Sequence, residues 1–128
     1  PDILTEIGDV MVIADLKTCE NARTDIFMRD AIKYGYDLQA YMYSNGVEKN
    51  IGKKCCFVFI AVEKKPPYAV NVLEADKYMM LKGQDLFREL LGTYHYCKES
   101  NNWYGYNGMN GDINNLTLPA WLLKEYEK

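Results

Sequence analysis

Cysteine spacing of the metal-binding kind is missing from this sequence. The four cysteines are Cys19, the adjacent pair Cys55 and Cys56, and Cys97, and no two of them show the C-x2-C spacing of a zinc site. A structural zinc ion is therefore not expected. Because Cys55 and Cys56 open an apolar run, they favour buried thiols in a reducing compartment over a disulfide framework. We accordingly predict a cytoplasmic protein.

Long apolar runs and an excess of basic charge are also lacking. No segment approaches the roughly 18 consecutive apolar residues of a membrane span, and no signal-like segment is expected at the start. Fifteen Lys and Arg residues stand against 18 Asp and Glu residues, which gives a net charge of −3. The charge balance therefore does not itself predict a nucleic-acid partner, although basic residues can still gather in one groove.

What is present is enough apolar material for one core. The chain has 128 residues, of which 48% are hydrophobic, so it suits one domain and is too short for two of ordinary size. It begins at Pro1, and the first residues already have the pattern of a strand. We therefore expect residues 1–128 to form the C-terminal portion of a single domain.

Apolar and β-branched stretches predict the strands. Asp2 to Thr5 and Val10 to Asp15 flank a glycine-containing turn, which is typical of a β-hairpin. The run from Cys55 to Val62 is continuously apolar, as expected of a strand buried in the middle of a sheet. Tyr68 to Leu73 follows a proline-rich turn and can pair with that run as a second hairpin.

Helical periodicity fills most of the remaining chain. Residues 24–44 carry an apolar stripe that Gly35 is expected to bend or split and that Asn45-Gly46 is expected to end. A second amphipathic helix is predicted from Ala75 to Glu99 and is expected to cover the sheet. The apolar residues of that helix are Tyr78, Leu81, Leu86, Leu90, Leu91 and Tyr94. Strands and helices in this order predict an α/β or α+β fold with a central mixed sheet flanked by helices.

The C-terminal part changes character. Residues 101–115 are rich in Gly and Asn and predict a loop, which is followed by a short apolar segment at residues 116–123. Trp103, Tyr104 and Tyr106 lie in that loop. Such rings can stack on the bases of a frayed DNA end, but fastening the loop to a core is the interpretation we favour.

The residues that point to chemistry are Asp2, Asp15 and Lys17. Asp15 and Lys17 follow an apolar strand and are two residues apart, so their side chains lie on one face, and Asp2 on the partner strand can face them. Asp2 and Asp15 could bind Mg²⁺, which usually takes one or two carboxylates together with water and phosphate oxygens. A lysine beside them could position the attacking water and offset charge on a scissile phosphate. The pattern predicts phosphodiester hydrolysis.

The simpler alternative is a surface ion pair between Asp15 and Lys17, because a bare [D/E]-x-K string is common. The chain holds its own comparison in Glu63-Lys64-Lys65, which fits the same string. That copy lies in a proline-rich turn with no Pro-Asp strand before it, so we assign it to solvent.

The wider sequence resembles the PD-(D/E)xK exonucleases of the RecE, or exodeoxyribonuclease VIII, type. The resemblance rests on Pro1-Asp2, on Asp15-Leu-Lys-Thr18, and on a Gln-x-x-x-Tyr motif formed by Gln39 and Tyr43, which share one helix face. It continues through further segments, which are Val62-Glu-Lys-Lys-Pro-Pro-Tyr68, Trp103-Tyr-Gly-Tyr106 and Leu118-Pro-Ala-Trp121.

This resemblance implies a restriction-endonuclease-like fold and a set of roles. Asp2, Asp15, Lys17 and Gln39 would be catalytic, and the metal ligands would be Asp2, Asp15 and the backbone carbonyl of Leu16. Thr18 and Tyr43 would support the substrate or the structure, with core packing the favoured interpretation for Tyr43. The enzyme would use two Mg²⁺ ions, or Mn²⁺, to degrade linear double-stranded DNA from its ends in phage or prophage recombination. A homo-oligomeric ring around DNA and a single-strand annealing protein are the implied partners.

Two departures from the family pattern are visible. The family carries an acidic residue on a helix, and often a histidine, upstream of the Pro-Asp pair, and the sequence has no residues there. The single histidine, His95, lies in the late predicted helix and does not suit that role. Cys19 stands where we expect a threonine, just past the catalytic residues.

Three other functions remain open on the sequence. The first is a catalytically incomplete PD-(D/E)xK domain that binds DNA or serves assembly. The second is another nuclease of the same superfamily, either an endonuclease or a single-strand exonuclease with an iron-sulfur cluster, although the cysteines are not arranged for a cluster. The third is an unrelated α/β interaction domain in which these charges lie on the surface.

Overall fold

The computed structural model describes residues 1–127, and these divide into two compact units, residues 1–90 and 91–127. The division falls inside a long helix. The prediction of one domain over residues 1–128 stays a prediction. No helix among the described residues is long and apolar enough to span a membrane.

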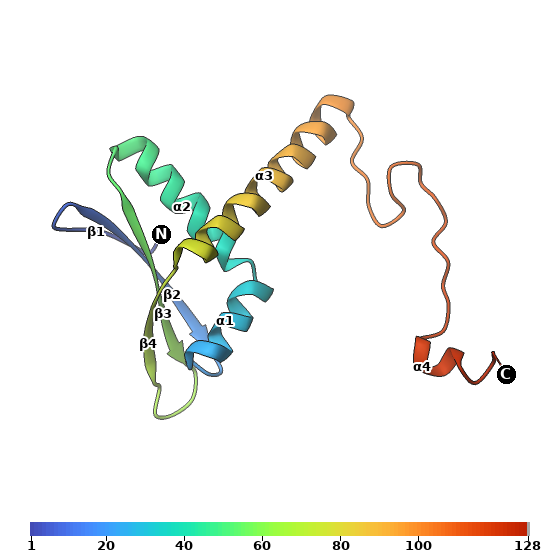
Figure 1. Ribbon diagram of the computed structural model, residues 1–128, viewed down its shortest axis with the longest axis horizontal. Helices are drawn as coiled ribbons and strands as arrows, with labels where there is room; N and C mark the ends of the chain where they lie inside the picture. The colour runs from blue at the N-terminus through green and yellow to red at the C-terminus, as the bar shows by residue number, and fades with distance from the viewer. Residues whose placement is uncertain (128) are drawn as a thin grey trace. The chain divides into compact units, whose positions relative to one another are not determined.

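The first unit is built on a mixed four-stranded sheet in the order β1-β2-β3-β4, which confirms the predicted fold class (Figure 1). The strands are β1 (Ile3–Ile7), β2 (Val10–Cys19), β3 (Cys55–Glu63) and β4 (Val70–Glu74). Both outer pairs are antiparallel, whereas β2 and β3 run parallel. A parallel pair needs a crossover, and α1 (Thr24–Lys33) and α2 (Tyr36–Ile51) supply it.

Both predicted hairpins are present. Gly8 has a φ of +61°, a value that favours glycine, in the tight turn between β1 and β2. The second strand of this hairpin extends beyond the predicted end at Asp15 as far as Cys19. It does so because Leu16 to Cys19 continue the parallel ladder with β3 after β1 has ended. Lys17 therefore stays in regular strand geometry.

Gly35 divides the predicted helix of residues 24–44 into α1 and α2, as expected, with a left-handed φ of +70°. Asn45-Gly46 does not end the second helix, so that prediction was wrong. A glycine inside a helix costs only about 1 kcal/mol, and Val47 beyond it packs against the core. The helix instead ends at Gly52, whose φ of +74° provides a left-handed cap.

The core of the first unit lies between the sheet and the crossover helices. Its buried residues from the strands are Ile13, Phe57, Phe59 and Ala61, and those from the helices are Phe27, Ala31 and Ala40. By strand alternation, these strand residues belong to the same face as Asp15 and Lys17. Asp15 and Lys17 therefore lie on the helix-covered face of the sheet.

The helix α3 (Lys77–Ser100) forms where predicted, but its apolar stripe does not cover the sheet. Tyr78 and Leu81 are more than half exposed, and Leu90 and Leu91 are exposed as well. In the first unit the helix packs through Met79 and Met80, which lie against the core, and through Gly83, which lies against α2. The stripe was misassigned because helical periodicity marks an apolar face without showing what covers it.

Residues 91–127 contain the end of α3, a segment with turns but no regular strand, and the short helix α4 (Ala120–Leu123). Cys97 is buried in this unit, and the ring of Trp103 meets that of Tyr94 edge-on at 5.8 Å. Trp103 therefore makes the kind of contact expected of a residue that anchors a loop. Tyr106, in contrast, is 99% exposed.

Candidate functional site

The site begins with the register of the β1–β2 hairpin. Ile3 pairs with Ala14 at the end of the ladder, so one further step on each strand brings Asp2 beside Asp15. The carboxylate Oδ2 of Asp2 accepts a hydrogen bond of 2.7 Å from the backbone N–H of Leu16. This bond ties the start of the chain to the strand that carries Asp15. It uses the amide of Leu16, whereas the predicted ligand is the carbonyl of that residue.

Asp15 is the buried centre of the site, with 4% of its surface exposed. Its two carboxylate oxygens have different partners: Oδ1 accepts a hydrogen bond of 3.1 Å from Nε2 of Gln39, and Oδ2 lies 2.5 Å from Nζ of Lys17. A buried carboxylate is costly unless it is paired. The structure therefore brings Asp15, Lys17 and Gln39 together from β2 and α2.

Lys17 lies between a carboxylate and an aromatic ring. Its side chain is 18% exposed, and its Nζ stands 4.5 Å from the centroid of the Tyr36 ring. Sequence reasoning missed Tyr36, because its place in the site depends on the break at Gly35 that sets the direction of α2. The spacing from Tyr36 to Gln39 is three residues, which is a signal that the two share one helix face.

Two residues with predicted supporting roles lie outside this cluster. Tyr43 is partly buried against the core, with its ring 6.3 Å from that of Phe57. Thr18 is exposed and, by strand alternation, falls on the opposite face of the sheet from Asp15. His95 is exposed in α3, within residues 91–128.

The second [D/E]-x-K string has a different environment. Lys64 and Lys65 are exposed and both lie within about 3.5 Å of Glu20. Glu63 is only half-buried, and its Oε1 accepts a hydrogen bond of 2.9 Å from the N–H of Ala22. The lysines are in solvent as predicted, whereas Glu63 at the end of β3 holds the loop between β2 and α1.

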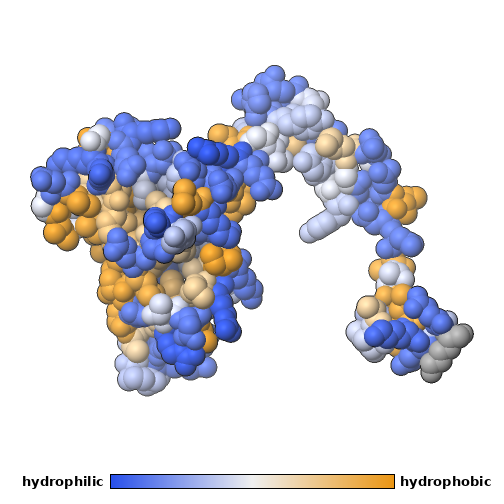
Figure 2. All heavy atoms as spheres, viewed as in Figure 1, coloured by the Kyte–Doolittle hydropathy of each residue, from blue (hydrophilic) through white to orange (hydrophobic). Residues whose placement is uncertain are grey.

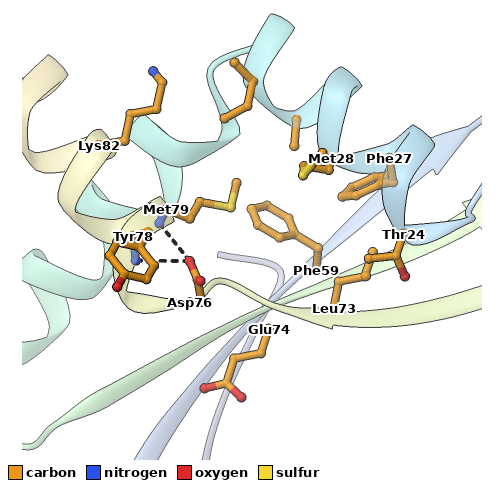
Figure 3. Close-up of a pocket in the computed structure, with 12 residues that line it drawn as sticks. Thr24, Phe27, Met28, Phe59, Leu73, Glu74, Asp76, Tyr78, Met79 and Lys82 are labelled. Carbon is orange, nitrogen blue, oxygen red and sulfur yellow. Dashed lines mark hydrogen bonds between the residues drawn. The ribbon is translucent and has the colours of Figure 1, made fainter.

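A pocket of about 530 Å³ opens elsewhere in the first unit, between α1, β4 and the beginning of α3 (Figure 3). Its lining is largely apolar and includes Phe27, Met28, Phe59 and Met79. Asp76 at its edge accepts backbone hydrogen bonds of 3.0 and 2.8 Å from Tyr78 and Met79, so this carboxylate caps α3. The pocket does not include Asp15 or Lys17.

The site offers carboxylate oxygens to a hard cation, but few of them. Asp2 and Asp15 supply the one or two carboxylates that Mg²⁺ commonly takes, and the buried Oδ2 of Asp15 has no hydrogen-bond donor besides the Lys17 ammonium. No group of three or more His, Cys, Asp or Glu side chains within residues 1–127 is arranged to hold a metal ion. The donor set therefore fits a magnesium ion that keeps water and phosphate in its shell.

Comparisons with known proteins bear on the family and on the fold. Residues 2–113 match a family described as "PDDEXK-like domain of unknown function". The crystal structure of a "putative exonuclease" from Eubacterium rectale has a similar fold, with a TM-score of 0.65 at 18% sequence identity. The alignment covers 94% of this chain and 48% of that one, so the chain spans about half the length of the solved structure. No curated protein matches the sequence.

Proposed function

Because this chain belongs to the PDDEXK-like family, we propose that it carries the active site of a divalent-metal-dependent nuclease that cleaves DNA phosphodiester bonds. The observation that carries this proposal is the Asp15 carboxylate, buried and held between Lys17 and Gln39. A surface ion pair would not need a buried carboxylate with an amide fixing its second oxygen. The third sequence alternative, an interaction domain with incidental charges, loses its basis here.

The residues of the site would have different roles. Asp2 and Asp15 would hold the metal, which when bound acts as a Lewis acid toward the phosphate and lowers the pKa of water. Gln39 donates to Oδ1 of Asp15 and so fixes the plane of the carboxylate. Lys17 brings a positive charge to the same place, where it offsets the negative charge that develops on the phosphate during cleavage. The low exposure of Asp15 and Lys17 keeps competing water out and strengthens these interactions.

We further propose linear double-stranded DNA, attacked from its ends in the presence of Mg²⁺ or Mn²⁺, as the substrate. This proposal follows the RecE-type pattern of Asp15-Leu-Lys-Thr18 together with Gln39 and Tyr43. The assembly into a ring, the annealing protein as partner and the role in phage recombination stay predictions.

Lys17 and Lys65 form a matched pair for testing the site, because each is the lysine of a [D/E]-x-K string in the same chain. We expect the protein to degrade linear duplex DNA with Mg²⁺, and the Lys17→Gln variant to be at least about 100-fold slower, as is common when a charge-stabilising group is removed. Lys65→Gln should keep the wild-type rate, since Lys65 is exposed beside Glu20 and lies beyond the end of β3, whereas Asp15 pairs with Phe59 within the sheet. Rates are measured by loss of end-labelled DNA.

A covalently closed circle and a chelator complete this experiment. The circle should stay intact, and EDTA should stop digestion of the linear DNA. Cleavage of the circle would replace the exonuclease with an endonuclease. Equal rates for the Lys17→Gln and Lys65→Gln variants would show that the cluster around Asp15 is not the active site.

A specific observation favours a second candidate, a PD-(D/E)xK domain that binds DNA without cleaving it. Within residues 1–127 no group of three or more His, Cys, Asp or Glu side chains is arranged to hold a metal ion, so Asp2 and Asp15 would hold it alone. Calorimetric titration with Mn²⁺ separates the candidates. A nuclease should bind the ion and lose about 10- to 100-fold in affinity on Gln39→Ala, the usual effect of removing a group that orients a ligand. An incomplete domain should show no Mn²⁺ binding and no cleavage while still retaining DNA in a gel-shift assay.

A further inference from the structure

The ammonium group of Lys17 has two neighbours of different kinds. One is Oδ2 of Asp15 at 2.5 Å, and the other is the face of the Tyr36 ring, whose centroid is 4.5 Å from Nζ. A cation over an aromatic face is attracted by the negative charge density of the ring, and the attraction grows when both are shielded from water. Here the Lys17 side chain is 18% exposed and Tyr36 is partly buried.

The two contacts respond differently to a bound metal ion. Oδ1 of Asp15 already accepts a hydrogen bond from Gln39, so a divalent cation on this carboxylate competes with Lys17 for Oδ2 and also repels the ammonium group. The ion pair therefore weakens when the site is loaded. The Tyr36 ring belongs to α2 and is uncharged, so it does not compete for the metal ion. Its attraction for the Lys17 ammonium group therefore remains.

Tyr36 is well fixed for such a role. It is the first residue of α2, directly after the left-handed Gly35. Its ring stacks on Phe59 at 5.8 Å and lies 6.0 Å from Phe27, both of which are buried in the core. Gln39 lies one turn later on the same helix. One turn of α2 thus holds both Lys17 and Asp15.

We propose that Tyr36 is a positioning residue, whose ring face keeps the Lys17 ammonium beside Asp15 when a divalent metal ion occupies the carboxylate. Its effect on cleavage rests on the proposed nuclease function, whereas the contact itself can be measured without any cleavage. The Tyr36 ring touches neither the metal nor the phosphate in this role, and acts only through Lys17.

The contact is tested by NMR on protein labelled with ¹³C-lysine. Protons above a ring face are shifted upfield, so the Hε signals of Lys17, assigned by their absence in Lys17→Arg, should lie upfield of those of the exposed lysines. The shift should persist when MgCl₂ is added and in Tyr36→Phe, and should disappear in Tyr36→Leu. Tyr34→Leu is the matched control, because the Tyr34 ring lies tilted against Tyr36, with centroids 5.9 Å apart, but contacts Lys33 rather than Lys17. An unshifted Lys17 signal in the wild type, or one lost on adding MgCl₂, would overturn the proposal.

Tyr36→Leu removes the attraction between the ring and the cation, but it also disturbs the packing of the core. A second substitution at residue 36 separates these two effects. Pentafluorophenylalanine at residue 36 keeps an aromatic ring in place but reverses its quadrupole, so it no longer attracts a cation. If the protein cleaves DNA, this variant should lose about tenfold in kcat with KM within twofold of the wild type, and Tyr36→Phe should match the wild type. Equal kcat for the fluorinated and Phe variants would reject a positioning role. A shifted Lys17 signal in a protein that cleaves no DNA would reject the nuclease function and leave the contact standing.

Discussion

At the residue scale, the sheet surrounds the thiol of Cys56 with groups that oppose its ionisation. Burial raises the pKa of Cys56 to about 11, and the hydrogen bond to Glu74 and the negative charge of that carboxylate act in the same direction. Burial also raises the pKa of the neighbouring Cys55 and of Cys19. The thiolate is the reactive form of cysteine, so these thiols are chemically quiet near neutral pH.

Alkylation of Cys56 should therefore depend steeply on pH. At pH 8 a thiol with a pKa of about 11 is only about 0.1% thiolate. We expect iodoacetamide to modify Cys56 slowly at pH 8 and about tenfold faster at pH 9, as followed by mass spectrometry of its peptide. Glu74→Gln should lower the pKa and raise the rate at pH 8, and urea-unfolded protein provides the reference. Modification of Cys56 at the unfolded rate in the native protein would contradict this expectation.

Residue-level prediction from the sequence worked where geometry is local. Strand alternation was enough to place Asp15 and Lys17 on one face, and the two-residue turn after β1 was enough to bring Asp2 beside them. The partners that come from α2 need the path of the crossover. Gln39 was named through a family motif, and the contact of Tyr36 with Lys17 was not foreseen at all.

At the scale of elements, α2 and α3 come into close contact at Gly83. A Cβ atom at this position would lie 2.1 Å from the carbonyl oxygen of Asp37 and 3.0 Å from Cβ of Tyr41. The same crossing is held by Lys82, whose Nζ lies 2.8 Å from the fully buried carboxylate of Asp37. Because α2 also carries Gln39 and Tyr36, this crossing supports the helix that completes the site.

The glycines of α3 make a matched pair for stability measurements. Gly83→Ala should destabilise the protein by about 1–3 kcal/mol, because backbone of α2 must move to admit the methyl group. Gly92→Ala in the same helix meets nothing within 4 Å and should stabilise it by about 0.5–1 kcal/mol through helix propensity alone. Urea unfolding followed by circular dichroism gives both values. A Gly83→Ala variant as stable as Gly92→Ala would show that the two helices do not cross this closely.

The sequence predicted which helices and strands exist, but it failed where tertiary packing decides where a helix ends or which of its faces is buried. Gly35 broke the first helix because its left-handed conformation is compatible with a change of direction, whereas Gly46 did not, because Val47 is drawn into the core. The apolar residues of α3 recur with helical periodicity as predicted. The face of α3 that packs against α2, however, is the one that carries Gly83, and a glycine adds no apolar side chain to the pattern. Sequence periodicity does not contain that information.

At the scale of the molecule, the described part of the sheet is covered on one face only. The opposite face, by strand alternation, carries Ile3, Ile7, Leu16, Val70 and Val72, all of them about half exposed or more. In Figure 2 apolar side chains gather over the strands of this unit. Contiguous exposed apolar surface on this scale favours contact with other apolar groups.

This uncovered face should bind the dye anilinonaphthalene sulfonate in the folded protein. Ile7 and Val72 are 66% and 65% exposed on the two edge strands, so Ile7→Thr combined with Val72→Thr should reduce the dye fluorescence at least about twofold with little loss of stability. Leu116→Thr is the control, since Leu116 is 98% exposed outside the sheet. Equal fluorescence of the double variant and the control would show that the dye binds elsewhere.

The parallel pairing of β2 with β3 also sets the point during folding at which the proposed site can assemble. This pairing closes a loop over residues 20–54, and such non-local closure is slow compared with forming a hairpin or a helix. Both hairpins and both crossover helices can form before it, yet Asp15 meets Gln39 only once α2 is laid across the sheet. The contact between Asp15 and Gln39 in a refolding experiment therefore reports the completed strand order, and a chain with every element formed but β2 and β3 unpaired would lack the proposed site.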